Sequence, residues 1–301
     1  MDELAALLDG PRARGAFVIR SVLDPPWSVR VEDRAPLSVI VMVRGDGWVV
    51  PDSGAPVPFH EGDVVVVRGP GHYTVADDPG TAPLAVIHPE ERSTTPEGDE
   101  LCEAWDQGVR TWGANPDGAV VMISGTYRFD GEVGGRLLSA LPHVAVVSGD
   151  ALVPLLATEV AKDLPGQQAV LDRLLDLLLI SALRALLARE TSWYRAHLDP
   201  AVGRALRLLH EAPARPWTIA ALAGEVGVSR AALARRFTEL VGEPPMAHLT
   251  SWRLSLAADL LREPGTTLEA VARRVGYGSA FALSSAFKRV RGERPSAFRR
   301  R

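Results

Sequence analysis

This sequence has one cysteine, and it lacks long apolar runs and the features of a secretory signal peptide. Its single cysteine, Cys102, excludes a disulfide within the chain, which suits a reducing compartment, and no activating neighbour in the sequence points to a redox role. Charged residues interrupt the leucine-rich stretch 170–187, so no apolar run is long enough for a membrane-spanning helix. The first residues lack the basic stretch and long apolar stretch of a secretory signal. We therefore expect a cytoplasmic protein that does not enter a membrane.

Histidines with the spacing of a metal site are also missing. A β-barrel that holds a catalytic metal commonly supplies several His side chains and a Glu from facing strands. Here His60, His72 and His88 each lie near an expected strand end or loop, and no His-x-His pair occurs. We therefore expect no metal, no cofactor and no enzymatic activity. A metal-dependent enzyme of small molecules with a nucleic-acid-binding tail is the alternative.

Charge is divided unevenly along the chain. Residues 201–301 contain 17 Lys and Arg against 8 Asp and Glu, a net charge of +9, whereas residues 1–200 contain 16 against 29, a net charge of −13. The overall charge of −4 therefore conceals an acidic first part and a basic last part. A phosphate backbone attracts a basic surface because binding releases the counterions condensed on the nucleic acid. Charge alone is weak evidence for such a partner, and the last third of the chain supplies more.

The last third contains an internal repeat, in which apolar residues, a glycine, a serine and a proline recur in the same order. The offset between the copies is 49 residues up to the glycine and 50 after it, because the second turn has one extra residue. The matched residues are Ile219, Leu222, Ala223, Val226, Gly227, Ser229, Leu233, Phe237, Gly242 and Pro245 in the first copy, and Leu268, Val271, Ala272, Val275, Gly276, Ser279, Leu283, Phe287, Gly292 and Pro295 in the second.

Each copy predicts two helices joined by a short turn. Apolar residues at positions i, i+3, i+4 and i+7 indicate one face of a helix, which the glycine then ends in a left-handed conformation. The serine, Ser229 or Ser279, is a suitable N-cap for the next helix. This arrangement is the helix-turn-helix unit, whose second helix lies in the major groove of DNA. Ordinary helical hairpins packed as a bundle are the alternative, but two copies in register favour DNA binding.

The first half of the chain has the pattern of a β domain. Short runs rich in β-branched residues recur between residue 13 and about residue 147, and turn signals rich in Gly, Asp, Asn and Pro separate them. Many short strands at this spacing predict an antiparallel sandwich or barrel. The clearest runs are 38–43, 48–50, 64–67, 84–87 and 120–123.

Residues 149–190 change to a helical period, which predicts a short helix over 151–161 and a longer one over 167–190. The longer helix has more apolar residues than one face packed against a barrel would use. We therefore predict a dimerisation element, with packing inside the subunit as the alternative. Its expected pairing seam consists of Leu171, Leu175, Leu178 and Ala182.

Short motifs in both parts of the chain point to a known family. They are Trp217-Thr218-Ile219, Gly227-Val228-Ser229, Leu233-Ala234-Arg235-Arg236-Phe237, Trp252-Arg253-Leu254, Val275-Gly276-Tyr277 and Gly292-Glu293-Arg294-Pro295 in the last third, and Arg44-Gly45, Trp48, Glu61-Gly62-Asp63 and His72 in the first. With these motifs, residues 202–300 resemble the DNA-binding domain of the AraC/XylS family of transcription regulators. The first part resembles the cupin-type barrel fused to many of those regulators.

The resemblance implies an α+β chain with three parts. Residues 1–148 would form a cupin-like antiparallel β-barrel that senses an effector, and 149–200 a helical linker and dimerisation segment. Residues 201–301 would form an all-α DNA-binding domain, with helix-turn-helix units at about 218–241 and 267–291. The expected function is that of a sequence-specific transcription regulator.

The residues that contact DNA are predicted from helix geometry and from the resemblance. Arg235 lies where family members place a base-contacting side chain, and arginine pairs well with guanine O6 and N7. Arg230 and Arg236 are expected to contact phosphates or to be solvated charges. The second unit departs from the family pattern, since Phe281 replaces a polar residue and Ser285 an arginine, so its helix is expected to act mainly as a backbone clamp. Its expected contacts are Ser279, Ser285, Lys288 and Arg289, and Ser229 completes the set.

The expected partners are promoter DNA, a small-molecule effector, a second copy of the chain and RNA polymerase. Trp48, His72 and Tyr73 are the residues expected to line an effector pocket, although each could equally be a core or rim residue. A ligand that prefers one arrangement of the DNA-binding arms would shift the population toward it. In a third interpretation, the first domain serves only as a scaffold for a dimer.

Overall fold

The computed structural model of the chain describes residues 18–89, 92–108, 110–127, 141–190 and 192–299, together with Glu132, Gly135 and Leu138. Residues 13–17, where the β pattern begins, lie outside this part of the chain. The described residues form two compact units, an N-terminal unit within 11–129 and 141–186 and a helical unit made mainly by residues from 187 onward. In the described ranges, no helix is both long enough and apolar enough to cross a membrane.

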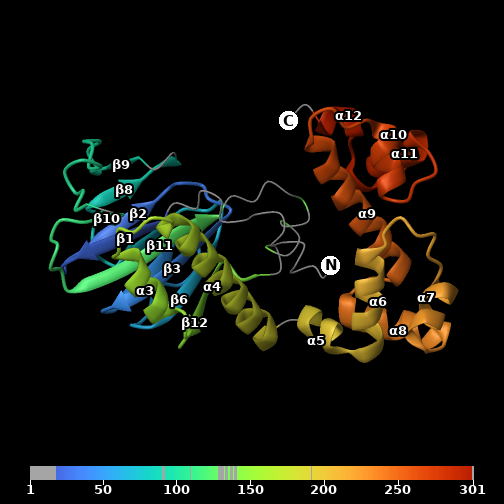
Figure 1. Cartoon of the computed structure of the whole chain (residues 1–301), viewed down its shortest axis with the longest axis horizontal. Helices are drawn as coiled ribbons and strands as arrows, with labels where there is room; N and C mark the ends of the chain where they lie inside the picture. Colours follow the sequence, from blue (N-terminus) through green and yellow to red (C-terminus); the bar gives the residue numbers. More distant parts are fainter. Residues whose placement is uncertain are drawn as a thin grey trace. The chain divides into compact units, whose positions relative to one another are not determined.

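The described strands of the N-terminal unit form two six-stranded sheets (Figure 1). The pairs β1–β10 and β2–β8 are parallel, and the other pairs are antiparallel. The first sheet has the order β10 (Thr111–Trp112), β1 (Val18–Leu23), β11 (Val120–Tyr127), β3 (Leu37–Arg44), β6 (Asp63–Arg68) and β12 (Val144–Ser148). The second has the order β5 (Val57–Phe59), β4 (Gly47–Pro51), β7 (Tyr73–Ala76), β2 (Ser28–Val31), β8 (Ala85–Ile87) and β9 (Ser93–Thr94).

Alternate residues of both sheets build a shared hydrophobic core. Side chains on neighbouring positions of a strand point to opposite faces, so every second residue turns inward. Ile40 and Met42 of β3 join this core, as do Val49 of β4 and Val75 of β7. Trp27, in the turn between β1 and β2, is fully buried within the same cluster. The β-branched runs of the sequence are therefore explained by burial between two sheets.

Two helices cover the outer face of the first sheet, α3 (Val153–Val160) and α4 (Gln167–Glu190). The Tyr127 hydroxyl of β11 donates a hydrogen bond to the Leu175 carbonyl oxygen of α4 at 2.8 Å. A Cβ on Gly125 would lie 3.4 Å from the Leu175 side chain, an ordinary contact distance, so helix and sheet lie close together at this point. Residues on both faces of β3 are consequently buried, which explains its continuous apolar sequence.

The predicted dimerisation seam lies inside this packing. Leu171, Leu175, Leu178 and Ala182 are all 0% exposed within the chain. They pack within the subunit, which is the alternative that the sequence left open, and they are not a pairing surface in this conformation. The choice of these seam residues was wrong because α4 has apolar residues on more than one side, whereas dimerisation itself stays a prediction. Periodicity identifies an apolar face without identifying the surface that covers it.

The predicted α+β architecture is confirmed, but its β part is not a closed barrel. No strand pair in the described ranges links the two sheets, so the unit is an open sandwich. The helical segment predicted over 149–200 is not a separate part either. Within this segment, residues 149–186 belong to the N-terminal unit, and residues 187–200 belong to the helical unit.

The helical unit contains two clusters of buried side chains (Figure 1). The first lies among α5, α6, α7, α8 and the start of α9, and the second lies among the rest of α9, α10, α11 and α12. Leu249 of α9 joins the first cluster, whereas Ala257 and Leu261 of the same helix join the second. The helices are α5 (Ser192–Leu198), α6 (Pro200–Glu211), α7 (Ile219–Val226), α8 (Arg230–Val241), α9 (Pro245–Arg262), α10 (Leu268–Arg274), α11 (Ala280–Arg291) and α12 (Pro295–Phe298).

Candidate nucleic-acid interface and small-molecule cavity

The first repeat forms a helix-turn-helix from α7 and α8, and local signals explain each boundary. The Thr218 hydroxyl oxygen accepts a hydrogen bond from the Ala221 amide at 3.1 Å and caps α7. Gly227 ends α7 with a φ of 74°, a left-handed conformation that favours glycine. The Ser229 hydroxyl oxygen then accepts from the Ala232 amide at 3.2 Å and caps α8. The position of α8 is thus set by its caps and by the burial of its inner face.

The second repeat forms the same structure from α10 and α11. Thr267 caps α10, and the Ser279 hydroxyl oxygen accepts from the Ala282 amide at 3.2 Å to cap α11. Gly276 has a φ of 83°, and a Cβ at this position would lie 2.7 Å from the Ala214 Cα. Glycine is therefore required in this turn both for its conformation and for the space. The predicted pairs of helices are present in both copies.

The outward face of α8 carries the predicted reading residue. Arg235 is exposed, and Arg230 is exposed at the start of the same helix. Arg236 has a different environment, since its Nε lies 2.5 Å from a carboxylate oxygen of Asp199. Asp199 is buried and caps α6, accepting hydrogen bonds from the Ala201 and Val202 amides. Arg236 therefore ties α8 to the start of α6, a role that its sequence position did not indicate.

The outward face of α11 carries other residue types than the outward face of α8. Ser285, Lys288 and Arg289 are exposed, as expected for contacts to DNA. Phe281, one turn before Ser285 on the same face, is 82% exposed. The sequence showed Phe281 only as a departure from the family pattern, and its exposure emerges from the structure.

A polar chain crosses the core beside the first helix-turn-helix. The Nε2 atoms of His210 in α6 and His248 in α9 lie 2.9 Å apart, and the His248 Nδ1 lies 2.9 Å from a Glu243 carboxylate oxygen. The His210 ring stacks on Trp252 with a centroid distance of 4.1 Å. Both histidines are buried, so the hydrogen bond between their Nε2 atoms satisfies polar atoms that water cannot reach. These hydrogen-bonded side chains join α6 to α9 and support the helix-turn-helix that carries Arg235.

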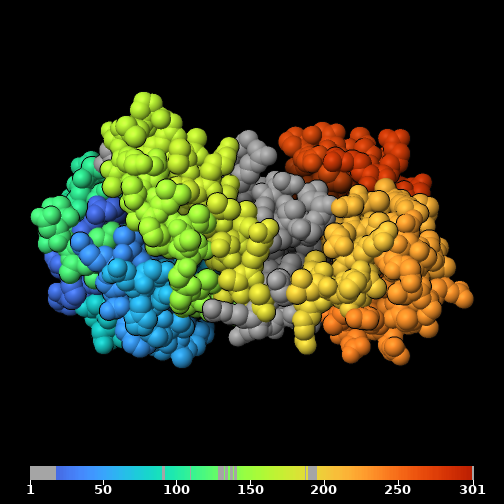
Figure 2. Space-filling model, turned by 60° about the horizontal axis from the view of Figure 1, so that its bottom comes forward, coloured from blue at the N-terminus to red at the C-terminus, as the bar shows by residue number. Residues whose placement is uncertain are grey.

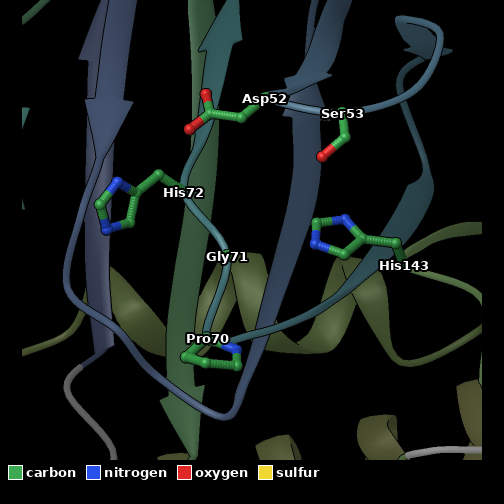
Figure 3. A pocket seen from close by; sticks show the side chains of 6 residues that line it. All are labelled: Asp52, Ser53, Pro70, Gly71, His72 and His143. Atoms are coloured by element: carbon green, nitrogen blue, oxygen red, sulfur yellow. The ribbon is translucent and has the colours of Figure 1, made fainter.

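A cavity of about 330 Å³ opens at one edge of the N-terminal unit (Figure 3). In the view of Figure 3, the His72 and His143 rings flank the cavity, and the Ser53 hydroxyl points into it. A Cβ on Gly71 would lie 2.8 Å from the His143 Nε2, so a larger residue there would displace this imidazole. The lining residues are Asp52, Ser53, Pro70, Gly71, His72 and His143.

The charge in this cavity is set by neighbouring ion pairs. The Arg30 guanidinium binds both carboxylate oxygens of Asp52, at 2.5 and 2.9 Å. These hydrogen bonds lower the pKa of Asp52 below its ordinary value, so the carboxylate stays ionised. The His72 Nδ1 lies 3.8 Å from a Glu32 carboxylate oxygen, near enough for a charge interaction if the ring is protonated. The cavity therefore offers imidazole, hydroxyl and carboxylate groups to a polar ligand.

The structure does not bring the three predicted pocket residues together. Only His72 lines the cavity. Tyr73 belongs to the core between the sheets, and burial raises its pKa. Trp48 lies on β4 beside Val49, which points into the core, so the Trp48 side chain is on the opposite face of the sheet. His143 was missed because it is 71 residues from His72 in the sequence, and no local pattern links the two.

The remaining candidates for chemistry lie apart from the cavity. The His60 Nδ1 lies 2.8 Å from an Asp46 carboxylate oxygen on an exposed turn, and the His88 Nε2 lies 3.0 Å from the Thr94 hydroxyl oxygen. The Cys102 Sγ lies 3.2 Å from the Ser93 hydroxyl oxygen. In the part of the chain that the structure describes, no group of three or more His, Cys, Asp or Glu could hold a metal ion.

Comparisons with known proteins agree with this two-part architecture. A family model described as a cupin matches residues 2–188, and one described as a helix-turn-helix domain matches residues 222–301. An AraC-like transcription regulator of Streptomyces lividans is 32% identical, with 100% of this chain and 98% of the relative covered. Another, from Streptomyces antibioticus, is also 32% identical, with 100% and 99% covered. The HTH-type transcriptional regulator AlkR of Acinetobacter baylyi is 25% identical, with 99% of each chain covered.

The two matched domains define the class, a cupin domain followed by a helix-turn-helix domain. The chain belongs to the family of AraC-like transcription regulators. The prediction of a DNA-binding transcription regulator is confirmed at this level.

Proposed function

We propose that the chain recognises a specific promoter sequence mainly through α8. The observation that carries this proposal is the exposed Arg235 on the outward face of the second helix of a fully capped helix-turn-helix. Arginine can donate two hydrogen bonds to O6 and N7 of one guanine, the commonest specific contact in the major groove. Arg235 would therefore select a G·C pair. Arg230, at the start of the same helix, would contact a phosphate and fix the register.

The second helix-turn-helix would add affinity through the backbone. Lys288 and Arg289 are exposed in the last turn of α11, where they can approach phosphates. The joining helix α9 has 18 residues and so spans about 27 Å, a length suited to units that enter neighbouring turns of the major groove. The basic charge of residues 201–301 supports the same role.

The cavity beside His72 and His143 is the proposed effector site. It is large enough for a small metabolite, and its lining favours a polar molecule over an apolar one. Effector control requires that the ligand bind one arrangement of the chain more tightly than another. His72→Ala and His143→Ala should then remove the response to the effector while leaving DNA binding intact. His60→Ala is the matched control, because His60 is 68% exposed in its side chain and lies outside the cavity.

We propose that the chain forms a homodimer through the outward face of α4, one of the two helices that cover the first sheet. Val170 and Leu177, seven positions apart on α4, are 44% and 48% exposed and share one side of the helix. Figure 2 shows these two helices in yellow-green at the surface of the N-terminal unit. A second copy that presents the same face would cover these side chains. Leu177→Arg should shift the sedimentation of the chain toward the monomer, whereas Leu84→Arg, at another exposed leucine, should not. A contact with RNA polymerase stays a prediction.

The test of the regulatory function is selection of bound fragments from sheared genomic DNA by the purified chain, with and without a pool of metabolites. A sharp sequence motif is expected with the wild-type chain, and a change of motif occupancy with metabolites would support the effector site. If the chain showed nothing but salt-sensitive binding without sequence preference, the proposal would be contradicted and the enzyme alternative would be favoured.

A further inference from the structure

Phe281 is an exposed phenylalanine near the start of α11, the second helix of the second helix-turn-helix. Single apolar side chains are common on protein surfaces, so an 82% exposed ring is not by itself evidence of a site. Phe281, however, is the second residue of α11 and lies two positions after the N-cap Ser279 of the helix-turn-helix. The N-terminal residues of such a helix are those that meet base edges in the major groove.

The rest of the helix shows which side meets the DNA. Leu283, Ala286 and Phe287 face inward and are buried in the second core. Phe281, Ser285, Lys288 and Arg289 are spaced at i, i+4, i+7 and i+8, so they share the outward face. The two cations of this face lie in the last turn and suit phosphates. The apolar ring is at the opposite end, where the helix would enter the groove.

We propose that Phe281 is a specificity-determining residue that packs against the C5-methyl groups of thymine. The thymine methyl is the apolar group that a base pair presents in the major groove, and phenylalanine is one of the side chains that contacts it. Cytosine lacks this methyl, so the contact distinguishes T·A from C·G without a hydrogen bond. This inference rests on the proposed DNA recognition and names the base that the second unit reads.

The equivalent position of the first unit supports this assignment. Ala231 occupies it in α8, fifty residues earlier, and is also exposed. A methyl group reaches less far than a ring, and the first unit instead has Arg235 one turn later, where the second has Ser285. The loss of the arginine and the gain of the aromatic ring thus occur in the same helix. The second helix exchanges a hydrogen-bonding reader for an apolar one.

The experiment removes the methyl group from the DNA and the ring from the protein in a cross-comparison. The probe is the fragment recovered by genomic selection, with the segment covered by α11 located by footprinting. Each thymine of that segment is replaced singly by deoxyuridine, which keeps all hydrogen-bonding groups. Wild-type full-length chain should lose roughly four-fold in affinity at one or two neighbouring thymines, about the effect of one buried methyl-sized group.

The variant Phe281→Ala should bind the unmodified fragment roughly ten-fold more weakly and should be indifferent to deoxyuridine. Phe281→Leu, which keeps an apolar side chain, should retain part of the methyl dependence. Because the side chain is exposed, neither substitution should alter the circular dichroism of the folded chain. Arg235→Ala is the control that should keep the full deoxyuridine effect.

Three outcomes would overturn the inference. Equal deoxyuridine sensitivity in the wild type and Phe281→Ala would assign the methyl contact to another residue. Unchanged DNA binding by Phe281→Ala would place the ring against a different partner, such as a protein. A wild type that is insensitive to deoxyuridine but still sequence-specific would refute the thymine contact alone, whereas absence of any specific fragment would refute the proposed DNA recognition as well.

Discussion

The two helix-turn-helix units share a scaffold and differ in the surface they present. Both have threonine and serine caps, a left-handed glycine in or beside the turn and a buried phenylalanine at the same position. Their outward faces have almost nothing in common. Four equivalent exposed positions show this, which are Ala231, Arg235, Thr238 and Glu239 in α8 and Phe281, Ser285, Lys288 and Arg289 in α11.

The two copies of the repeat therefore share the residues that cap and pack the helices and differ in the residues that face outward. Residues that cap or pack a helix are constrained by the backbone and the core, so they recur. Outward residues are constrained only by the ligand. In α8, Arg235 is at mid-helix, where it can reach a base, and in α11 Lys288 and Arg289 are in the last turn, where they can reach a phosphate. The two units would therefore contact DNA differently, because α8 would read a base through Arg235, whereas α11 would hold the backbone through Lys288 and Arg289 and meet a thymine methyl through Phe281.

The buried phenylalanines give the largest expected effect and test whether the scaffold is truly repeated. Phe237→Ala and Phe287→Ala each remove a fully buried ring and leave a cavity. Each should lower the free energy of unfolding by about 3–5 kcal/mol. Denaturant unfolding followed by the helical circular dichroism signal measures both. A large loss in one variant and a negligible loss in the other would show that the two cores are not equivalent.

The reading arginine gives the next largest effect. Arg235→Ala should weaken binding to the selected site by about 1–3 kcal/mol and flatten the base preference at one or two positions. The reason is the loss of a two-point contact to guanine. Binding to the selected fragment and to single-base variants measures the preference. Ser285→Ala is the matched change in α11 and should have little effect, whereas unchanged discrimination by Arg235→Ala would refute the assignment.

The serine caps should give a smaller and equal effect in both units. Ser229→Ala and Ser279→Ala each remove the oxygen that accepts an amide hydrogen bond at the start of a helix. Each should cost about 1 kcal/mol of stability, and aspartate at the same position should restore most of it. Thermal unfolding measures the loss. If DNA affinity fell far more than stability, the serine would contact DNA directly, as its sequence position suggested.

The backbone clamp gives the smallest expected effect. Arg289→Ala should weaken binding to selected and random duplexes alike, because a phosphate contact carries no base information. The slope of log affinity against log salt concentration should fall by about one. Titration at several salt concentrations measures it. A loss restricted to the selected site would instead make Arg289 a base reader and remove the contrast between the two helices.

The helical unit could be predicted almost entirely from the sequence, because its signals are local. A cap lies three residues from the amide it binds, and a turn glycine lies beside the helix it ends. The roles of Arg236 and Phe281 were less accessible. The partner of Arg236 is Asp199, which is distant in the sequence, and the exposure of Phe281 depends on which face of α11 the core covers.

The N-terminal unit was predictable as a class of fold but not as a site. Runs of β-branched residues indicate strands, yet they do not indicate whether two sheets close into a barrel. The cavity combines Gly71 and His72 with His143, a histidine from a distant segment. The seam of α4 illustrates the same limit of local information, since an apolar stripe is compatible with a sheet of the same chain or with a second chain.

The joining helix α9 has a consequence for how the helical unit unfolds. Its first half packs in one hydrophobic cluster and its second half in the other, while the backbone between Leu249 and Leu254 is continuous. Opening either cluster removes the tertiary support from half of a single helix, and short isolated helices are marginal in water. The two clusters should therefore behave as one cooperative unit in hydrogen exchange, with the amides of α9 protected to the level of global unfolding. The two helix-turn-helix units would therefore unfold together, because both pack against α9.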